Sequence, residues 1–204
     1  LESLGCEVIE LNCEPDGNFT RGTEPLPENL KDLCQAVISY DADAGFAVDP
    51  DADRLAVVNE KGEPLGEEYT LVLAADGYLE NIVKSEKFVV NLSTSLALEK
   101  LAESKNCSVI RSAVGEINVV NKMNEIGSDL GGEGNGGVIL RECHLGRDSL
   151  VAVTMVLYRL SQSNETLSEI HQFLPQFEII KDKVSLEGID PEELIKKVSG
   201  LFND

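Results

Sequence analysis

Short apolar runs alternate with stretches of helical spacing along most of the chain, and this alternation predicts an α/β fold. The strand-like runs are rich in Val, Ile and Phe, whereas the helical stretches repeat apolar residues three and four positions apart. Because parallel strands are joined by crossover helices, the alternation indicates layered α/β units with mostly parallel, mixed sheets. The predicted strands are 6–11, 43–48, 54–59, 87–92, 107–112 and 137–140. The predicted helices are 27–40, 67–83, 95–105, 115–126, 146–163, 166–174 and 190–202.

The elements divide into two layered α/β units and a short tail. The first unit ends in a hairpin that turns at residues 60–62. In the second unit, Ser93 or Thr94 is expected to cap the helix that follows. The tail from Phe177 holds one charged strand candidate, 178–186, and one helix, which is too little for a domain and indicates the start of another.

The composition is strongly acidic and narrows the classes of function. The 204 residues include 37 Asp and Glu against 17 Lys and Arg, which gives a net charge of −20. Nucleic acid is held by basic patches, so we expect no nucleic-acid partner. The five cysteines are an odd number without a CxxC pair, which favours neither a disulfide framework nor a zinc site and fits a reducing, cytoplasmic compartment. No apolar run approaches the roughly 18 residues of a membrane span, so we expect no membrane partner.

Three aspartates stand at alternate positions directly after the predicted strand 43–48. Asp49, Asp51 and Asp53 lie in the segment DPDADR, which ends at Arg54. Side chains two residues apart on extended backbone point the same way, so the three carboxylates converge if the chain leaves its strand extended. Converging carboxylates repel one another, and a divalent cation that prefers oxygen ligands relieves the repulsion. The pattern therefore predicts a metal site, with an exposed acidic loop that binds no ion as the plain alternative.

Two other interpretations of the aspartates compete with this one. An EF-hand loop would place Asp49 at its first position and Glu60 at its last, and both match. However, Arg54 stands where that loop needs glycine, and the flanking segments are predicted strands instead of helices. A phosphatase with an aspartate nucleophile would need a later lysine and an acidic pair, and the sequence shows no clear pair. An acidic calcium-binding module and such a phosphatase stay open as alternatives.

Arg54 beside a divalent cation is a pairing suited to phosphoryl groups. The ion neutralises the oxygens that gain charge, and a guanidinium binds them through two parallel hydrogen bonds. The plain alternative is a local salt bridge from Arg54 to the aspartates.

A glycine-rich segment, GGEGNGGV at residues 131–138, is the second candidate site. It lacks the GK[ST] of a P-loop, and a predicted strand follows it instead of the helix of a dinucleotide-binding fold. Glycine lets the backbone approach a ligand, and Glu133 and Asn135, two residues apart, can point one way towards neighbouring hydroxyl groups. These features suit a sugar, whereas a tight turn that simply needs glycine is the alternative.

The two motifs, in this order, resemble those of the α-D-phosphohexomutase family, which comprises phosphoglucomutase, phosphomannomutase and phosphoglucosamine mutase. DPDADR resembles the family's metal loop, D-x-D-x-D-R, and GGEGNGGV resembles its sugar-specificity loop, G-E-x-[SN]-G. SAVGEINVVNKM is similar to a segment that also faces the sugar, and GCEVIELNCEPDGNF followed by PENLKDL is similar to the family's second domain. The resemblance covers nearly the whole chain.

The resemblance implies a protein with four domains around one cleft. It implies an isomerase that moves phosphate between the 1- and 6-positions of a hexose through a phosphoserine and a bisphosphate intermediate. Residues 1–66 would be the C-terminal part of domain 2, residues 67–176 domain 3, and residues 177–204 a linker and the start of domain 4. The partners would be hexose 1-phosphate, 6-phosphate and 1,6-bisphosphate, together with domains 1 and 4 of the same protein.

The resemblance also implies roles for single residues. Arg54 would be the catalytic residue, in contact with the transferring phosphate. The Mg²⁺ ligands would be Asp49, Asp51 and Asp53. The residues that bind sugar hydroxyls would be Glu133, Asn135 and Glu116. The motif GEGN does not separate glucosamine from mannose or glucose.

Several parts of the family pattern are not found. They are the T-x-S-H-N phosphoserine loop, the strand that opens the second domain and the R-x-S-G-T-E-P phosphate-clamp loop, so we expect a middle fragment, truncated at the start of its first unit, that does not turn over. RGTEP at residues 21–25 lies in the wrong domain and lacks the serine, and is interpreted as a chance likeness. Gly137 stands where many members have histidine, so no proton transfer by histidine is expected there. His144 and His171 are expected to be structural.

Overall fold

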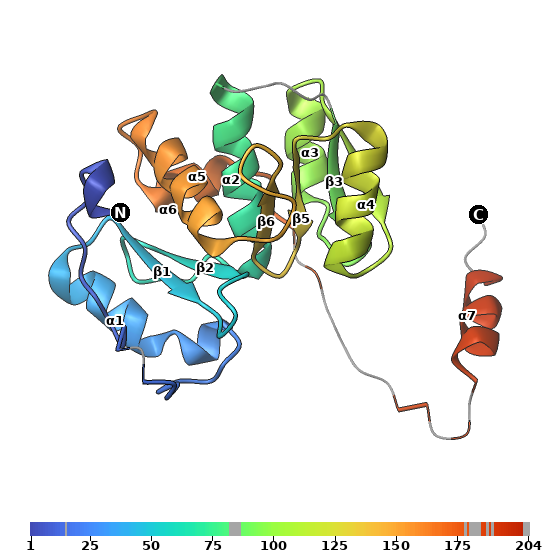
Figure 1. Ribbon diagram of the computed structural model, residues 1–204, viewed down its shortest axis with the longest axis horizontal. Coiled ribbons are helices and arrows are strands. Elements are labelled where there is room, and N and C mark those ends of the chain that lie inside the picture. Colours follow the sequence, from blue (N-terminus) through green and yellow to red (C-terminus); the bar gives the residue numbers. More distant parts are fainter. Residues whose placement is uncertain are drawn as a thin grey trace.

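The computed structural model of the chain describes residues 1–14, 16–81, 87–177, 179, 185–186, 188 and 190–201. A two-stranded sheet with helix α1 forms the first part, and a four-stranded sheet between layers of helices forms the second (Figure 1). The predicted α/β class is confirmed. The strands are β1 (Ala44–Val48), β2 (Leu55–Asn59), β3 (Lys87–Asn91), β4 (Ser108–Ser112), β5 (Leu130–Glu133) and β6 (Gly137–Leu140). The α-helices are α1 (Lys31–Tyr40), α2 (Glu67–Asn81), α3 (Ala97–Ser104), α4 (Glu116–Ile126), α5 (Ser149–Ser161), α6 (Leu167–Phe173) and α7 (Pro191–Ser199).

Strand β2 joins the two parts because each of its faces packs against a different one. It pairs antiparallel with β1, which places Phe46 opposite Val57. Successive side chains of a strand point to opposite faces. Ala56 and Val58 therefore pack in one cluster with residues of α1, whereas Leu55 and Val57 belong to the main core of the second part. The loop that precedes β2 is consequently held against the second part.

The larger sheet has the strand order β4-β3-β5-β6. Strand β3 is parallel to both β4 and β5, while β5 and β6 form an antiparallel hairpin. Phe88 and Val90 of β3 face the main core formed with α2, α3 and α5, and Val89 between them faces Met123 of α4. Helices thus cover both faces of the sheet, as crossover connections require.

The structure contradicts the predicted strand 6–11 and the predicted cap of the helix that follows β3. Residues 6–11 form no strand, because no neighbouring strand lies beside them in the part of the chain that the structure describes, and a strand needs a partner for its backbone groups. Ser93 and Thr94 do not cap α3. Their hydroxyl groups donate instead to Oδ1 of Asn91, at 3.0 and 2.9 Å, and close the turn after β3.

Residues 130–133 were predicted to belong to a glycine-rich loop, but they form strand β5. It lies against α4, where a Cβ on Gly131 would stand 2.5 Å from Sδ of Met123 and 2.9 Å from the backbone oxygen of Val89. Close packing therefore requires glycine, and a strand of glycines shows no pattern of apolar side chains. Most of the strand candidate 178–186 lies outside the described residues. Among the helices that the structure describes, none is both long and apolar enough to cross a membrane.

His171 on α6 packs edge-on against Tyr69 of α2, with 4.3 Å between the ring centroids. The Tyr69 hydroxyl donates to the backbone oxygen of Pro175 and accepts from the N–H of Phe177, so this contact holds the end of the second part. Nε2 of His171 is buried and has no hydrogen-bond partner among the described residues. Burial lowers the pKa of His171, although the negative charge of Glu63 opposes the shift.

We expect acid to destabilise the fold through His171. Burial disfavours the protonated ring, so its stabilising contribution is complete above the unfolded pKa of about 6.5 and is lost as the pH falls through the lower folded pKa. His171→Phe keeps a ring against Tyr69 but takes up no proton. Between about pH 7.5 and about pH 5.5, the free energy of unfolding in urea should fall more for the wild type than for this variant. Other titrating groups cancel in the comparison, and an equal fall would contradict the prediction.

Candidate active site

The loop between β1 and β2, residues 49–54, gathers three carboxylates. One oxygen atom from each of Asp49, Asp51 and Asp53 lies within 4.8 Å of the others. The loop is not extended as predicted. Its backbone closes through the N–H of Ala52, which donates to the backbone oxygen of Asp49 at 3.1 Å, and Ala52 adopts a left-handed φ of 58°. A tight turn therefore brings the carboxylates together.

Asp49 is the buried anchor of this loop. Its Oδ1 accepts from the N–H groups of Asp53 and Arg54, both at 3.1 Å, and its Oδ2 accepts from Nε of Arg54 at 2.5 Å. Burial alone would raise the pKa of Asp49, but the side-chain and backbone hydrogen bonds from Arg54 hold that pKa below its ordinary value. Asp49 is therefore a fixed, ionised carboxylate.

Asp53 is the half-buried carboxylate of the three, and it pairs with Arg147 through Oδ2 and lies near Arg54 through Oδ1. Burial raises its pKa to about 6; the positive charge of Arg147 opposes this rise, and the charges of Asp49 and Asp51 add to it. Oδ1 of Asp53 is buried and has no hydrogen-bond partner among the residues that the structure describes. A divalent cation would give that oxygen a partner and relieve the repulsion. The donor set therefore fits a cation that prefers carboxylate oxygens.

Arg54, the last residue of the aspartate loop, contacts both the loop itself and an earlier segment of the chain. Its Nε contacts Asp49, and its Nη1 pairs with Glu24. The hydrogen bond that Arg54 donates to the carboxylate of Glu24 is the largest influence on the pKa of Arg54 and raises it, although burial opposes this rise. Glu24 belongs to the RGTEP segment, and Arg21 of that segment donates to the backbone oxygen of Val48. Sequence reasoning missed Glu24 because no motif links it to an arginine 30 positions away.

The turn between β5 and β6, residues 133–137, presents Glu133 and Asn135. Glu133 is 4% exposed, and its Oε1 accepts from Nδ2 of Asn91 at 2.7 Å and from the N–H of Gly115 at 3.2 Å. Asn135 lies beside it, with Nδ2 3.4 Å from Oε2 of Glu133. The two polar residues of the glycine segment therefore belong to one hydrogen-bonded cluster.

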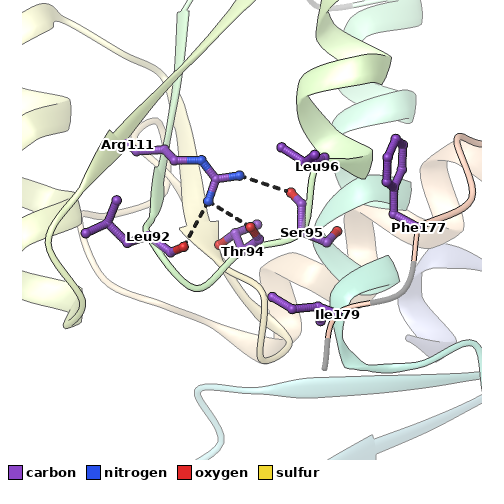
Figure 2. Close-up of a pocket in the computed structure, with 7 residues that line it drawn as sticks. All are labelled: Leu92, Thr94, Ser95, Leu96, Arg111, Phe177 and Ile179. Carbon is purple, nitrogen blue, oxygen red and sulfur yellow. Dashed lines mark hydrogen bonds between the residues drawn. The ribbon is translucent and has the colours of Figure 1, made fainter. Parts of the chain in front are cut away.

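The loop after β3 supports this turn. Oγ1 of Thr94 accepts from the N–H of Gly134 at 3.0 Å. Arg111 points into the loop, where its guanidinium donates to the backbone oxygens of Leu92, Thr94 and Ser95 (Figure 2). Arg111 thus positions the loop beneath the glycine turn. The hollow beside it, of about 390 Å³, is lined by Leu92, Thr94, Ser95, Leu96, Arg111, Phe177 and Ile179.

The aspartate loop and the glycine turn meet directly. The N–H of Leu55, which follows the aspartate loop, donates to the backbone oxygen of Gly136 in the glycine turn at 3.0 Å. The N–H of Ser149, the first residue of α5, donates to the backbone oxygen of Ala52 in the aspartate loop at 3.2 Å. Gly136 has a φ of +94°, and a Cβ there would stand 2.5 Å from the backbone oxygen of Leu55. Glycine therefore allows the close approach of the two segments.

Arg147 connects the two loops through its side chain. The guanidinium pairs with Asp53 through Nη2, with Glu133 through Nη1 at 2.5 Å, and with Glu116 through Nε at 3.3 Å. Glu116, the first residue of α4, also accepts from the N–H of Arg147 at 3.1 Å, and Oδ1 of Asn135 lies 3.5 Å from Nη1. One arginine therefore contacts an aspartate of the first loop and all three residues expected to face a sugar. Its only signal in the sequence is its place in HLGRD, shortly after the glycine segment.

The two histidines have contacts of their own. His144 lies 2.9 Å from Oδ2 of Asp148, whose Oδ1 accepts from the N–H groups at the start of α5. His171 packs on Tyr69, as described above. Both contacts agree with the structural roles expected for these residues.

Two family profiles match this chain. The profile described as phosphoglucomutase/phosphomannomutase, alpha/beta/alpha domain II, matches residues 1–62, and that of domain III matches residues 66–177. This chain belongs to the phosphoglucomutase/phosphomannomutase family. The resemblance drawn from the DPDADR and GEGN motifs is thereby confirmed, and the chain corresponds to two neighbouring domains of these α-D-phosphohexomutases.

Longer phosphohexomutases resemble the whole chain. A "Probable phosphoglucosamine mutase" of Methanopyrus kandleri is 35% identical over 202 residues, which cover 98% of this chain and 44% of that protein. A "Phosphoglucomutase/phosphomannomutase" of Thermococcus kodakarensis is 36% identical over 203 residues, with the same coverage of 98% and 44%. The structure of a family protein from Burkholderia thailandensis superposes with a TM-score of 0.76 at 29% identity, covering 86% of this chain and 38% of that one. The chain therefore spans less than half the length of these relatives.

Proposed function

We propose that the protein containing these two domains is an isomerase that moves a phosphoryl group between the 1- and 6-positions of a hexose. The observation that carries the proposal is the junction of the aspartate loop with the glycine turn, where Asp53 and Glu133 share the guanidinium of Arg147. A loop suited to a cation, in contact with a turn suited to hydroxyl groups, matches a sugar phosphate, which carries both kinds of group on one small molecule.

The aspartate loop would bind the phosphoryl end of the substrate. Asp49, Asp51 and Asp53 would hold Mg²⁺, which neutralises charge on phosphoryl oxygens when it is bound. Arg54 would contact the same oxygens. Its partner Glu24 has a side chain that is 52% exposed, whereas the side chain of Asp49 is fully buried. Arg54 would therefore keep Asp49 and exchange Glu24 for the phosphate.

The glycine turn would bind the sugar ring. Glu133 is held by Asn91 and Gly115, so its carboxylate is preorganised to accept hydrogen bonds from hydroxyl groups. Asn135 can donate to one hydroxyl and accept from another. Glu116, whose side chain is 37% exposed, would approach the ring from the start of α4.

The remaining machinery would come from other domains of the intact protein. We assign residues 1–66 to the C-terminal part of domain 2, residues 67–176 to domain 3, and residues 177–204 to a linker and the start of domain 4. Domains 1 and 4 would supply the phosphoserine and the phosphate clamp. The substrates would be the 1-phosphate, 6-phosphate and 1,6-bisphosphate of glucosamine, mannose or glucose, since the relatives are named for mutases of these sugars.

We expect the chain to bind glucose 1,6-bisphosphate only when Mg²⁺ is present. Isothermal titration calorimetry with and without Mg²⁺ should show this, and Asp51→Ala should weaken the Mg²⁺-dependent binding by roughly tenfold or more, because it removes a carboxylate ligand. Asp32→Ala on the exposed face of α1 is the matched control and should bind like the wild type. The two domains alone should bind without converting glucose 1-phosphate to glucose 6-phosphate.

The alternatives give different results in the same assays. An acidic calcium-binding module would take up Ca²⁺ more tightly than Mg²⁺ and would ignore the sugar. An aspartate-dependent phosphatase would hydrolyse simple phosphate esters and would lose that activity in Asp49→Asn. Either result would reject the mutase proposal.

A further inference from the structure

Arg147 forms ion pairs with three acidic residues at the junction of the aspartate loop and the glycine turn. Its side chain is only 16% exposed, and each of its three guanidinium nitrogens has an acidic partner: Nε has Glu116, Nη1 has Glu133 and Nη2 has Asp53. In this structure a protein cation therefore offsets part of the charge of the aspartate loop.

Gly137 makes the room in which Arg147 lies. A Cβ at Gly137 would stand 2.2 Å from Cδ of Arg147 and 3.0 Å from its Cγ. The φ of Gly137 lies outside the left-handed range, so the backbone conformation does not itself require glycine. Position 137 needs glycine because the side chain of Arg147 fills the space that a Cβ would take, and a larger residue there would displace Arg147.

The partners of Arg147 differ in what a bound cation would do to them. Asp53 also belongs to the group of three carboxylates suited to a divalent cation, whereas Glu116 and Glu133 lie on the sugar side of the junction. If the carboxylate of Asp53 coordinates a cation, Nη2 of Arg147 loses its ion-pair partner, while Nε keeps Glu116 and Nη1 keeps Glu133. The freed N–H groups then point from the sugar side towards the aspartate loop, where the mutase proposal places the phosphoryl group.

We propose that Arg147, placed by Gly137, is a substrate-binding residue that balances Asp53 before the cation binds and donates to a phosphoryl oxygen of the hexose phosphate afterwards. The proposal rests on the mutase function proposed above and adds a residue to it. Arg54 and Arg147 would then approach the phosphoryl group from the two sides of the junction, and both are arginines, whose planar N–H groups suit phosphate oxygens.

The test measures two affinities that should change in opposite directions. In Arg147→Gln, Mg²⁺ should bind about tenfold more tightly than in the wild type, because a competing positive charge on Asp53 is gone. At saturating Mg²⁺, glucose 1,6-bisphosphate should bind about tenfold more weakly, because a donor to its oxygens is gone. Gly137→Ser should move both affinities in the same directions, since its side chain needs the space of Arg147. Both affinities are read by calorimetry on the chain.

Arg141→Gln is the matched control. Arg141 donates to the backbone oxygens of Ser128 and Met123, both at 2.7 Å, and holds the end of α4 away from the site. Its loss should lower the melting temperature and leave both affinities unchanged. If Arg147 were only structural, Arg147→Gln would lower the melting temperature and weaken both affinities together, which would overturn the proposal.

The two proposals fail in different ways. If the wild type binds the bisphosphate with Mg²⁺ and Arg147→Gln binds it equally well, the role of Arg147 is rejected and the mutase site stands. If the wild type does not bind the bisphosphate at saturating Mg²⁺, the mutase site of this chain is rejected, and the role of Arg147 in substrate binding is rejected with it.

Discussion

Asp49→Ala is expected to lose both divalent-cation binding and folding stability, whereas Asp51→Ala is expected to lose cation binding alone. Asp49 is 2% exposed and accepts three hydrogen bonds that close the loop, two from backbone N–H groups and one from Nε of Arg54. Without Asp49 the guanidinium of Arg54 loses its buried partner. The free energy of unfolding should fall by about 2–3 kcal/mol, the cost of breaking a buried charge pair less the relief of repulsion within the cluster.

Asp51 stands in the same cluster but is exposed. Its replacement removes a carboxylate and some repulsion, so the free energy of unfolding should change by less than about 0.5 kcal/mol. Urea unfolding and Mg²⁺ calorimetry on both variants separate the two effects. Equal stability of the two variants would show that Asp49 does not hold the loop, and unchanged Mg²⁺ affinity in Asp51→Ala would show that the cluster is not the cation site.

Gly136→Ala is expected to be strongly destabilising, by about 2–5 kcal/mol. The residue has a φ of +94°, and a Cβ there would meet the backbone oxygen of Leu55 at 2.5 Å and its backbone nitrogen at 3.1 Å. The cost combines about 1–2 kcal/mol for a left-handed alanine with about 1–3 kcal/mol for overpacking against backbone that has no rotamer to change. The hydrogen bond from Leu55 to Gly136, which joins the two parts of the chain, would be lost as the backbones separate.

Gly127→Ala is the matched control for that experiment. Gly127 follows α4 with a left-handed φ of +68°, but a Cβ there would have no atom within 4 Å. Gly127→Ala should therefore lower the free energy of unfolding only by the cost of backbone strain, about 1 kcal/mol. The difference between the two variants in urea unfolding measures the close approach of Gly136 to Leu55. A loss in Gly136→Ala no larger than in Gly127→Ala would contradict the packing argument.

Local sequence predicted the elements whose signals are local. The apolar run at 87–92 and the helical spacing at 146–163 are present in the structure as β3 and α5. The aspartates were found because alternate carboxylates after a strand are unusual, although a turn instead of extended backbone brings them together. Strand β5 was missed because its glycines have no side chains to form a pattern, and 6–11 was overpredicted because pairing depends on a neighbouring strand.

The sequence by itself determined the α/β class, the two motifs and the family, because each depends on residues that lie close together in the chain. Only the tertiary structure shows that Glu24 and Arg147 contact residues of the candidate site. Arg147 reaches Asp53 across 94 positions, and Glu24 reaches Arg54 across 30. These contacts arise because β2 packs one face on α1 and the other on the core of the second part, which carries the aspartate loop to the glycine turn. This proximity depends on how the two faces of β2 pack, so no single segment of the sequence predicts it.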